Sequence, residues 1–132
     1  MSIIAQNVAP KDLVAAVTKL KAEGWRLVTC SSVELDATEM EILYHFDKNL
    51  ELTNLRVPVA KGGTLPSISG VYFAAFLVEN EIRDQFSLTF DGLVLDYQGK
   101  LYGDTVTTPV TSPFCSMQIK KAAATPEAKE VQ

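Results

Sequence analysis

Apolar residues are most concentrated in the middle of the chain, and this part predicts its central element. Pro66 and Ser67 are typical of a helix entrance, because an N-cap serine accepts a hydrogen bond from a first-turn N–H that has no intrahelical partner. The pattern therefore predicts a helix that begins at about Ile68. Residues 71–78 are apolar almost all round, so we expect this half of the helix to be buried on more than one side. Residues 79–85 are mainly polar, so we expect the C-terminal part of this helix to be charged.

In the chain before this helix, the spacing of apolar residues is first that of a helix and then that of strands. A stripe of apolar residues between Pro10 and Gly24 predicts an amphipathic helix at about residues 10–23. Period-two alternation and β-forming residues follow, and they predict strands joined by short turns into an antiparallel meander. Pro58 cannot donate a ladder hydrogen bond, so its strand lies at an edge or ends there. The predicted strands cover residues 25–33, 41–46 and 52–59, with turns around 36–38 and 47–49.

The chain after the central helix has weaker patterns. Residues 90–92 predict a turn, and Leu93 to Leu95 are compatible with a short strand. The sequence thus predicts an α+β fold with an N-terminal helix, an antiparallel three- to four-stranded sheet, a long central helix packed on the sheet and an extended C-terminal tail. We expect one domain at residues 1–103 and an extended or disordered tail at residues 104–132, which is rich in loop-forming and solvated residues.

Composition narrows the classes of function. The chain has 132 residues, which is most simply one domain, and its 47% hydrophobic content suits a globular core. A net charge of −4 without clustered Lys and Arg argues against a nucleic-acid partner. The longest apolar run, residues 71–78, is far shorter than the roughly 20 residues that span a bilayer. The N-terminus has no signal-peptide pattern, so we expect the chain to stay in the cytoplasm.

Three carboxylates on the central helix are the first candidates for chemistry. Glu79, Glu81 and Asp84 lie close enough in sequence to ligate a cation or share protons. Glu79 and Arg83, however, have the i,i+4 order that favours an intrahelical ion pair. No histidine lies nearby in the sequence, so this pattern favours a charged contact surface over a catalytic or metal site.

Cysteine and histidine offer a second, weaker candidate. Cys30 and Cys115 are isolated, which fits neither a disulfide framework nor a metal-binding pair, so we expect reduced thiols that pack as small residues. His45 is the single histidine, and a hairpin could place it on one face with Cys30 as a Cys/His dyad. No third orienting group can be named, so an enzyme built on this dyad ranks last. The pair Gly62–Gly63 is a flexible connector and not a phosphate-binding loop.

The central segment also resembles a known family. The run Leu65-Pro66-Ser67-Ile68, followed by Glu79-Asn80-Glu81, Asp84, Phe86, Leu88 and Phe90, is similar to the thirty-kilodalton C subunit of respiratory complex I and of membrane-bound energy-converting nickel–iron hydrogenases. Asn80 stands where the family pattern has Arg, and the His-Pro and basic segment that follows in the family is missing. These differences and the short chain favour the hydrogenase-type branch. The resemblance covers about residues 40–102.

The resemblance implies an accessory subunit of an oxidoreductase complex, peripheral on the cytoplasmic face of the cell membrane. Such a subunit has no catalytic residues, cofactor or metal of its own, and it assembles and stabilises a catalytic large subunit and an iron–sulfur small subunit. These partners would carry the iron–sulfur clusters and a Ni–Fe or quinone site. The alternative is a free-standing α+β binding or regulatory module. The implied subunit-interface residues are Pro66, Ser67, Glu79, Glu81, Arg83, Asp84, Phe86 and Phe90.

Overall fold

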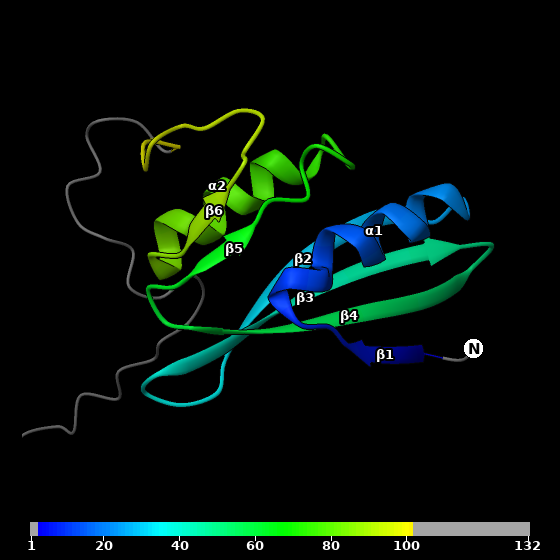
Figure 1. The fold of residues 1–132 in the computed structure, drawn as a ribbon, viewed down its shortest axis with the longest axis horizontal. Coiled ribbons are helices and arrows are strands. Elements are labelled where there is room, and N and C mark those ends of the chain that lie inside the picture. Colours follow the sequence, from blue (N-terminus) through cyan, green and yellow to red (C-terminus); the bar gives the residue numbers. More distant parts are fainter. Residues whose placement is uncertain (1–2, 102–132) are drawn as a thin grey trace, which may run out of the picture.

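The computed structural model describes residues 3–101, which form an α+β domain (Figure 1). The predicted fold class is therefore confirmed. The predicted tail, residues 104–132, and Cys115 lie outside the described residues. The elements in chain order are β1 (Ile3–Asn7), a single 3₁₀ turn (Pro10–Asp12), α1 (Leu13–Ala22), β2 (Arg26–Glu34), β3 (Glu39–Lys48), β4 (Glu51–Ala60), β5 (Thr64–Pro66), α2 (Ala75–Phe86) and β6 (Thr89–Asp91).

The main sheet has four strands in the order β1-β4-β3-β2. β2, β3 and β4 pair antiparallel, which confirms the predicted meander. The expectation of a purely antiparallel sheet is wrong, because β1 pairs parallel to β4. The five-residue sequence of β1 has little period of its own, and its strand conformation depends on the edge that β4 offers. Pro58 lies beyond Arg56, the last β4 residue that β1 pairs with, so this part of β4 is the edge that proline requires.

The hydrophobic core lies between the main sheet and the two helices, which Figure 1 shows above the same face of the sheet. Alternate residues of β3 point into it, as the period of two predicts. α1 contributes Leu13 and Val17, both fully buried, so its apolar stripe is core as expected. Burying such side chains stabilises the fold by about 1.5–3 kcal/mol each. The β3 side chains in the core are Met40, Ile42, Tyr44 and Phe46.

A second sheet of two short parallel strands, β5 and β6, flanks α2. Parallel strands need a crossover, and α2 is that crossover. The expected turn at residues 90–92 and strand at 93–95 are both wrong, because the strand is Thr89–Asp91 and only Gly92, with a φ of 82°, turns the chain. Leu65 and Phe90 face each other in this pair and are buried, which fixes its position against the core.

The central helix begins later than predicted. α2 starts at Ala75, whereas residues 68–74 form turns, so the expected start at Ile68 is wrong. Ser67 is not its N-cap, and the residue at that position, Ala74, makes no side-chain capping bond. The hydroxyl of Ser67 is instead hydrogen-bonded to the side chain of Glu79. The Ser67 hydroxyl therefore makes a tertiary hydrogen bond to Glu79 in place of the capping bond that the local sequence predicts.

Candidate functional site

The side chain of Glu79 lies in the interior of the domain, where none of it is exposed. One carboxyl oxygen accepts a hydrogen bond from the backbone N–H of Ile68 at 2.8 Å, and the other accepts one from the Ser67 hydroxyl. The predicted Glu79–Arg83 ion pair is therefore wrong. Glu79 joins the first turns of α2 to the chain that leaves β5, so its role within the chain is structural.

The contact continues through two serines to the segment after β6. The N–H of Ser69 donates to the Ser67 hydroxyl oxygen at 3.1 Å, and the two hydroxyl oxygens are 2.7 Å apart. The N–H of Val94 donates to the Ser69 hydroxyl oxygen at 3.0 Å. Glu79 is thus connected to Val94 through a chain of hydrogen bonds.

Asn80 holds the same segment directly, and sequence reasoning missed this role. Its amide nitrogen donates to the carbonyl oxygens of Phe76 at 2.7 Å and Leu95 at 2.9 Å, and its amide oxygen accepts from the N–H of Tyr97 at 3.0 Å. The side chain is fully buried. The available signal was local, since asparagine competes with helical hydrogen bonds and is unfavourable inside a helix unless it has another partner.

The last turn of α2 fixes the rest of the segment. Arg83 donates to and forms an ion pair with Asp96, whose carboxylate also accepts from the N–H of Gln98 at 2.7 Å. Asp84 accepts from the N–H of Leu101 at 3.2 Å. We call residues 94–101 the clamped segment, because Ser69 binds its first residue and α2 binds its middle and its last residue.

Three titratable groups meet beneath α2, and burial shifts each of them towards its neutral form. Loss of water raises the pKa of Glu79 to about 7, against the opposing effect of its hydrogen bonds to Ser67 and Ile68. Burial, and secondarily the charge of Glu79, raises the pKa of Cys30. Burial raises the pKa of Tyr44 well above its usual value, with smaller contributions from Cys30 and Glu79, and its hydroxyl has no hydrogen-bond partner. A thiol held neutral in this way is a poor nucleophile.

The Cys30/His45 dyad, which ranked last among the candidates, does not form. Cys30 pairs with Tyr44 across the β2–β3 ladder, and neighbouring residues of a strand point to opposite faces, so His45 lies on the other side of the sheet. Its ring nitrogens lie 2.9 Å from the Ser31 hydroxyl oxygen and 2.7 Å from the Asn54 amide oxygen. Within residues 3–101, no three His, Cys, Asp or Glu side chains are placed to hold a metal ion. In the same range, no helix combines the length and apolar character needed to cross a membrane.

Residues 6–100 match the family described as the respiratory-chain NADH dehydrogenase 30-kDa subunit. The chain belongs to this family. The resemblance seen in the sequence is thereby confirmed. The C subunit of the NADH-quinone oxidoreductase from Jannaschia sp. (strain CCS1) is 29% identical in an alignment of 143 positions. The alignment covers 96% of this chain and 69% of that protein.

A solved structure shares the fold. A chain of the membrane-bound sulfane sulfur reductase, an archaeal respiratory membrane complex, is similar with a TM-score of 0.65 and 16% identity over 74% of the present chain. The present chain, a member of the 30-kDa subunit family, spans 62% of the length of that solved chain. At this identity the similarity concerns the fold alone.

The interface residues that the family resemblance implies differ in how exposed they are in this chain. Glu79 and Phe90 are buried inside the domain, so neither is accessible from its surface. The remaining six are partly exposed, and their place in a subunit interface stays a prediction. Those six are Pro66, Ser67, Glu81, Arg83, Asp84 and Phe86.

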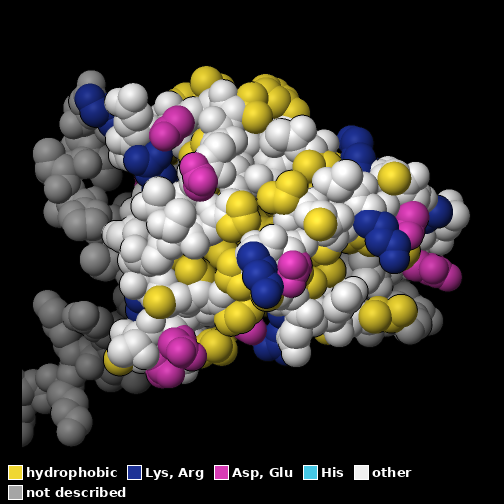
Figure 2. Space-filling view, in the orientation of Figure 1, with side chains coloured by type: hydrophobic (Ala, Val, Ile, Leu, Met, Phe, Trp, Pro, Cys, Tyr) yellow, Lys and Arg dark blue, Asp and Glu magenta, His cyan; other side chains and the backbone are white. Residues whose placement is uncertain are grey.

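The exposed side of α2 reverses another expectation. The apolar first half of the helix was expected to be buried on more than one side, but Leu77 and the preceding Phe73 are exposed. The polar residues Glu79 and Asn80 are buried instead. Figure 2 shows hydrophobic side chains along the upper edge of the domain, above α2. The sequence pattern thus predicted a helix in this region, but it placed its start too early and assigned its faces wrongly.

Proposed function

We propose that this chain is an accessory subunit of a membrane-associated, complex I-like oxidoreductase of the nickel–iron hydrogenase type. Its role is to assemble and stabilise a catalytic large subunit and an iron–sulfur small subunit, peripherally on the cytoplasmic face of the cell membrane. The electron carriers belong to these partners: iron–sulfur clusters and a Ni–Fe or quinone site. Family membership over residues 6–100 is the observation that carries the proposal.

The geometry of the family pattern supports a role in assembly. Asn80, Arg83 and Asp84 bind the clamped segment and give it a fixed course, whereas Glu79 binds the chain before α2. Residues used in this way create a shaped surface, and they do not converge on an open site where a substrate atom would sit. A preformed surface lowers the ordering cost of association, which is what an assembly subunit requires.

The hydrogenase branch is favoured by two features of the sequence. Asn80 replaces the Arg of the family pattern, and the present structure uses its amide to hold Leu95 and Tyr97. The His-Pro and basic segment that follows in the longer relatives is missing from residues 92–102.

Affinity purification of the tagged full chain from membranes of its native host tests the proposal. We expect a large subunit and an iron–sulfur subunit to co-purify in fixed ratio, identified by mass spectrometry. We also expect a deletion of the gene to lower the amount of assembled complex and re-expression to restore it. Recovery of the chain without other subunits would contradict the proposal and favour a free-standing binding module.

A further inference from the structure

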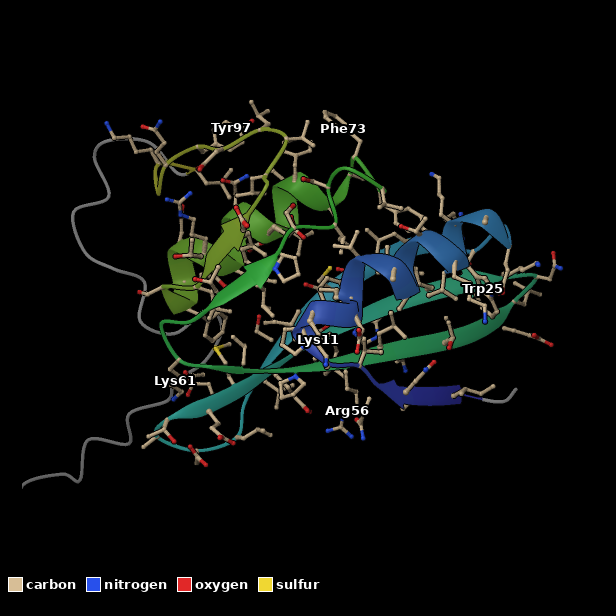
Figure 3. All side chains as sticks on the ribbon, viewed as in Figure 1. Lys11, Trp25, Arg56, Lys61, Phe73 and Tyr97 are labelled. Carbon is tan, nitrogen blue, oxygen red and sulfur yellow. The ribbon has the colours of Figure 1, made fainter. Side chains whose placement is uncertain are left out.

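An exposed cluster of apolar side chains covers α2 and the clamped segment. The exposed fractions are 60% for Phe73, 51% for Leu77, 54% for Val94, 42% for Leu95 and 38% for Tyr97. Phe76 connects the two parts, with ring centroids 4.9 Å from Phe73 and 6.4 Å from Tyr97. Figure 3 shows Phe73 and Tyr97 on the same side of the domain, pointing away from the sheet. We call these six residues the α2 apolar surface.

The domain holds this surface in place with buried polar side chains. Asn80 binds the backbone of Leu95 and Tyr97, and Ser69 binds the N–H of Val94. Burying a polar side chain is costly unless it is hydrogen-bonded. The hydrogen bonds of Asn80 and Ser69 therefore fix the backbone that carries these exposed apolar side chains. Stable monomers rarely expose contiguous apolar patches of this kind, which mark sites of protein association.

We propose that the α2 apolar surface is the docking site for an uncharged, aliphatic and aromatic surface of a neighbouring subunit of the same complex. This inference rests on the proposed function and names the contact surface that it requires. Interface centres are enriched in aromatic residues and depleted in charged ones, and half of the six residues here are aromatic.

Charge decides the chemistry of the occupant. None of the six side chains carries a charge, and the neighbouring Arg83 and Asp96 already neutralise each other. A charged partner residue placed over this surface would lose its water without gaining a counter-ion, which is unfavourable. The partner face is therefore apolar at its centre.

A groove continues the surface beyond Phe73. It has a volume of about 460 Å³, and Trp25, Tyr72 and Phe73 form its aromatic walls. Lys21 and Arg26 also line it, and Arg26 is paired with Asp47. The ammonium group of Lys21 lies 4.6 Å from the centre of the Tyr72 ring at its rim. Aromatic or aliphatic anchors that fill such pockets carry much of the binding energy of protein interfaces. The groove is thus suited to one large side chain of the same partner.

Site-specific photo-cross-linking tests the proposal in the full complex. Benzoylphenylalanine placed at Leu77 should form an adduct with a different subunit, whereas the same group at Leu50, which is 84% exposed on the β3–β4 turn, should not. An adduct with a second copy of this chain, with its own residues, or with no protein would overturn the proposal.

Substitutions provide an independent measurement. Phe73→Ser and Leu77→Ser should lower the affinity for the partner at least tenfold and so reduce the subunits that co-purify, with Leu50→Ser as the matched control. Because these side chains are exposed, the variants should keep the far-ultraviolet circular dichroism of the wild type. Full co-purification with both variants would overturn this surface and leave the proposed function intact. Failure of the wild-type chain to bring down any subunit would instead contradict the function.

Discussion

Glu79 is a buried carboxyl group that accepts hydrogen bonds from two donors, and within residues 3–101 no ion pair is formed with it. Its side chain accepts from Ser67 and Ile68 and is fully enclosed. Desolvation outweighs these bonds and raises its pKa to about 7. A carboxyl group of this kind ties two segments together and at the same time makes the stability of the fold depend on pH.

The raised pKa of Glu79 predicts that the chain becomes less stable as pH rises. The unperturbed pKa is 4.5 and the folded-state pKa is about 7, so the folded state binds more protons between these values. The stabilisation is fully present below about pH 4.5 and is lost as pH rises through about 7. One pKa unit corresponds to about 1.4 kcal/mol, so the total change is on the order of a few kcal/mol.

Urea unfolding of the wild type and Glu79→Gln between pH 4 and 8 measures this effect. The amide does not titrate and still offers an oxygen to the N–H of Ile68. The free energy of unfolding of the variant relative to the wild type should therefore increase with pH. A constant difference over the whole range would show that Glu79 does not titrate there.

Glu81 is a part-exposed acid of the family pattern, and its role in assembly stays a prediction. Breaking a desolvated charge pair across an interface from one side costs on the order of 2–5 kcal/mol. Glu81→Ala should leave the melting temperature of the isolated chain nearly unchanged, lower the yield of assembled complex and keep the turnover per complex. Glu51→Ala, a change of an exposed acid on β4, is the control. Full assembly with lost turnover would assign Glu81 to the reaction instead.

α2 acts as a scaffold for the segments on both sides of it in the chain. Its buried residues Glu79 and Asn80 bind the segments before and after it, and its last turn binds Asp96 and Leu101. The two kinds of contact differ in cost. Asn80 is enclosed, whereas the Arg83–Asp96 pair is partly exposed and therefore contributes less.

Asn80→Ala should destabilise the chain by about 1–3 kcal/mol, because it removes the hydrogen bonds of a buried side chain to the carbonyl of Leu95 and the N–H of Tyr97. Hydrogen exchange at Tyr97 should become faster, since its N–H loses its acceptor. Thr18→Ala removes an exposed bond to the carbonyl of Val14 and is the matched control, with an expected change within about 0.5 kcal/mol. Equal effects of the two substitutions would contradict the scaffold role of Asn80.

The domain packs the helices α1 and α2 on one face of its four-stranded sheet (Figure 1), and Tyr72 joins these parts. Its hydroxyl donates to the carbonyl of Trp25, between α1 and β2, at 2.7 Å. Its ring lies 5.5 Å from that of Phe46 on β3. The turns before α2 are thereby attached both to the α1–β2 connection and to the core.

Tyr72→Phe should cost about 1 kcal/mol, the usual net value of one hydrogen bond, whereas Tyr72→Ala should cost about 3–5 kcal/mol because it also leaves a cavity. Trp25 is the single tryptophan of the chain, so its fluorescence during urea unfolding gives a direct measurement. Similar values for the two variants would show that the Tyr72 ring contributes little to the core.

The elements with a regular pattern were predictable. The period of two placed all three strands of the meander within two residues of their observed bounds, and the apolar stripe placed α1. These patterns are local consequences of which side of an element faces the core. The similarity of residues 65–90 to a subunit family was likewise present in the sequence, because it lies in residue identities and spacing.

Partners distant in the sequence decided what the pattern could not. β1 is a strand because β4 offers it an edge, and α2 starts at Ala75 because Ser67 and Ile68 bind Glu79. The same contact reverses the expected faces of α2, since a glutamate and an asparagine are tolerated inside the domain once donors and acceptors from other segments satisfy them. A hydrophobicity pattern reflects what it costs to bury a side chain that has no hydrogen-bond partner. The partners of Glu79 and Asn80 come from other segments, and only the folded chain brings them together.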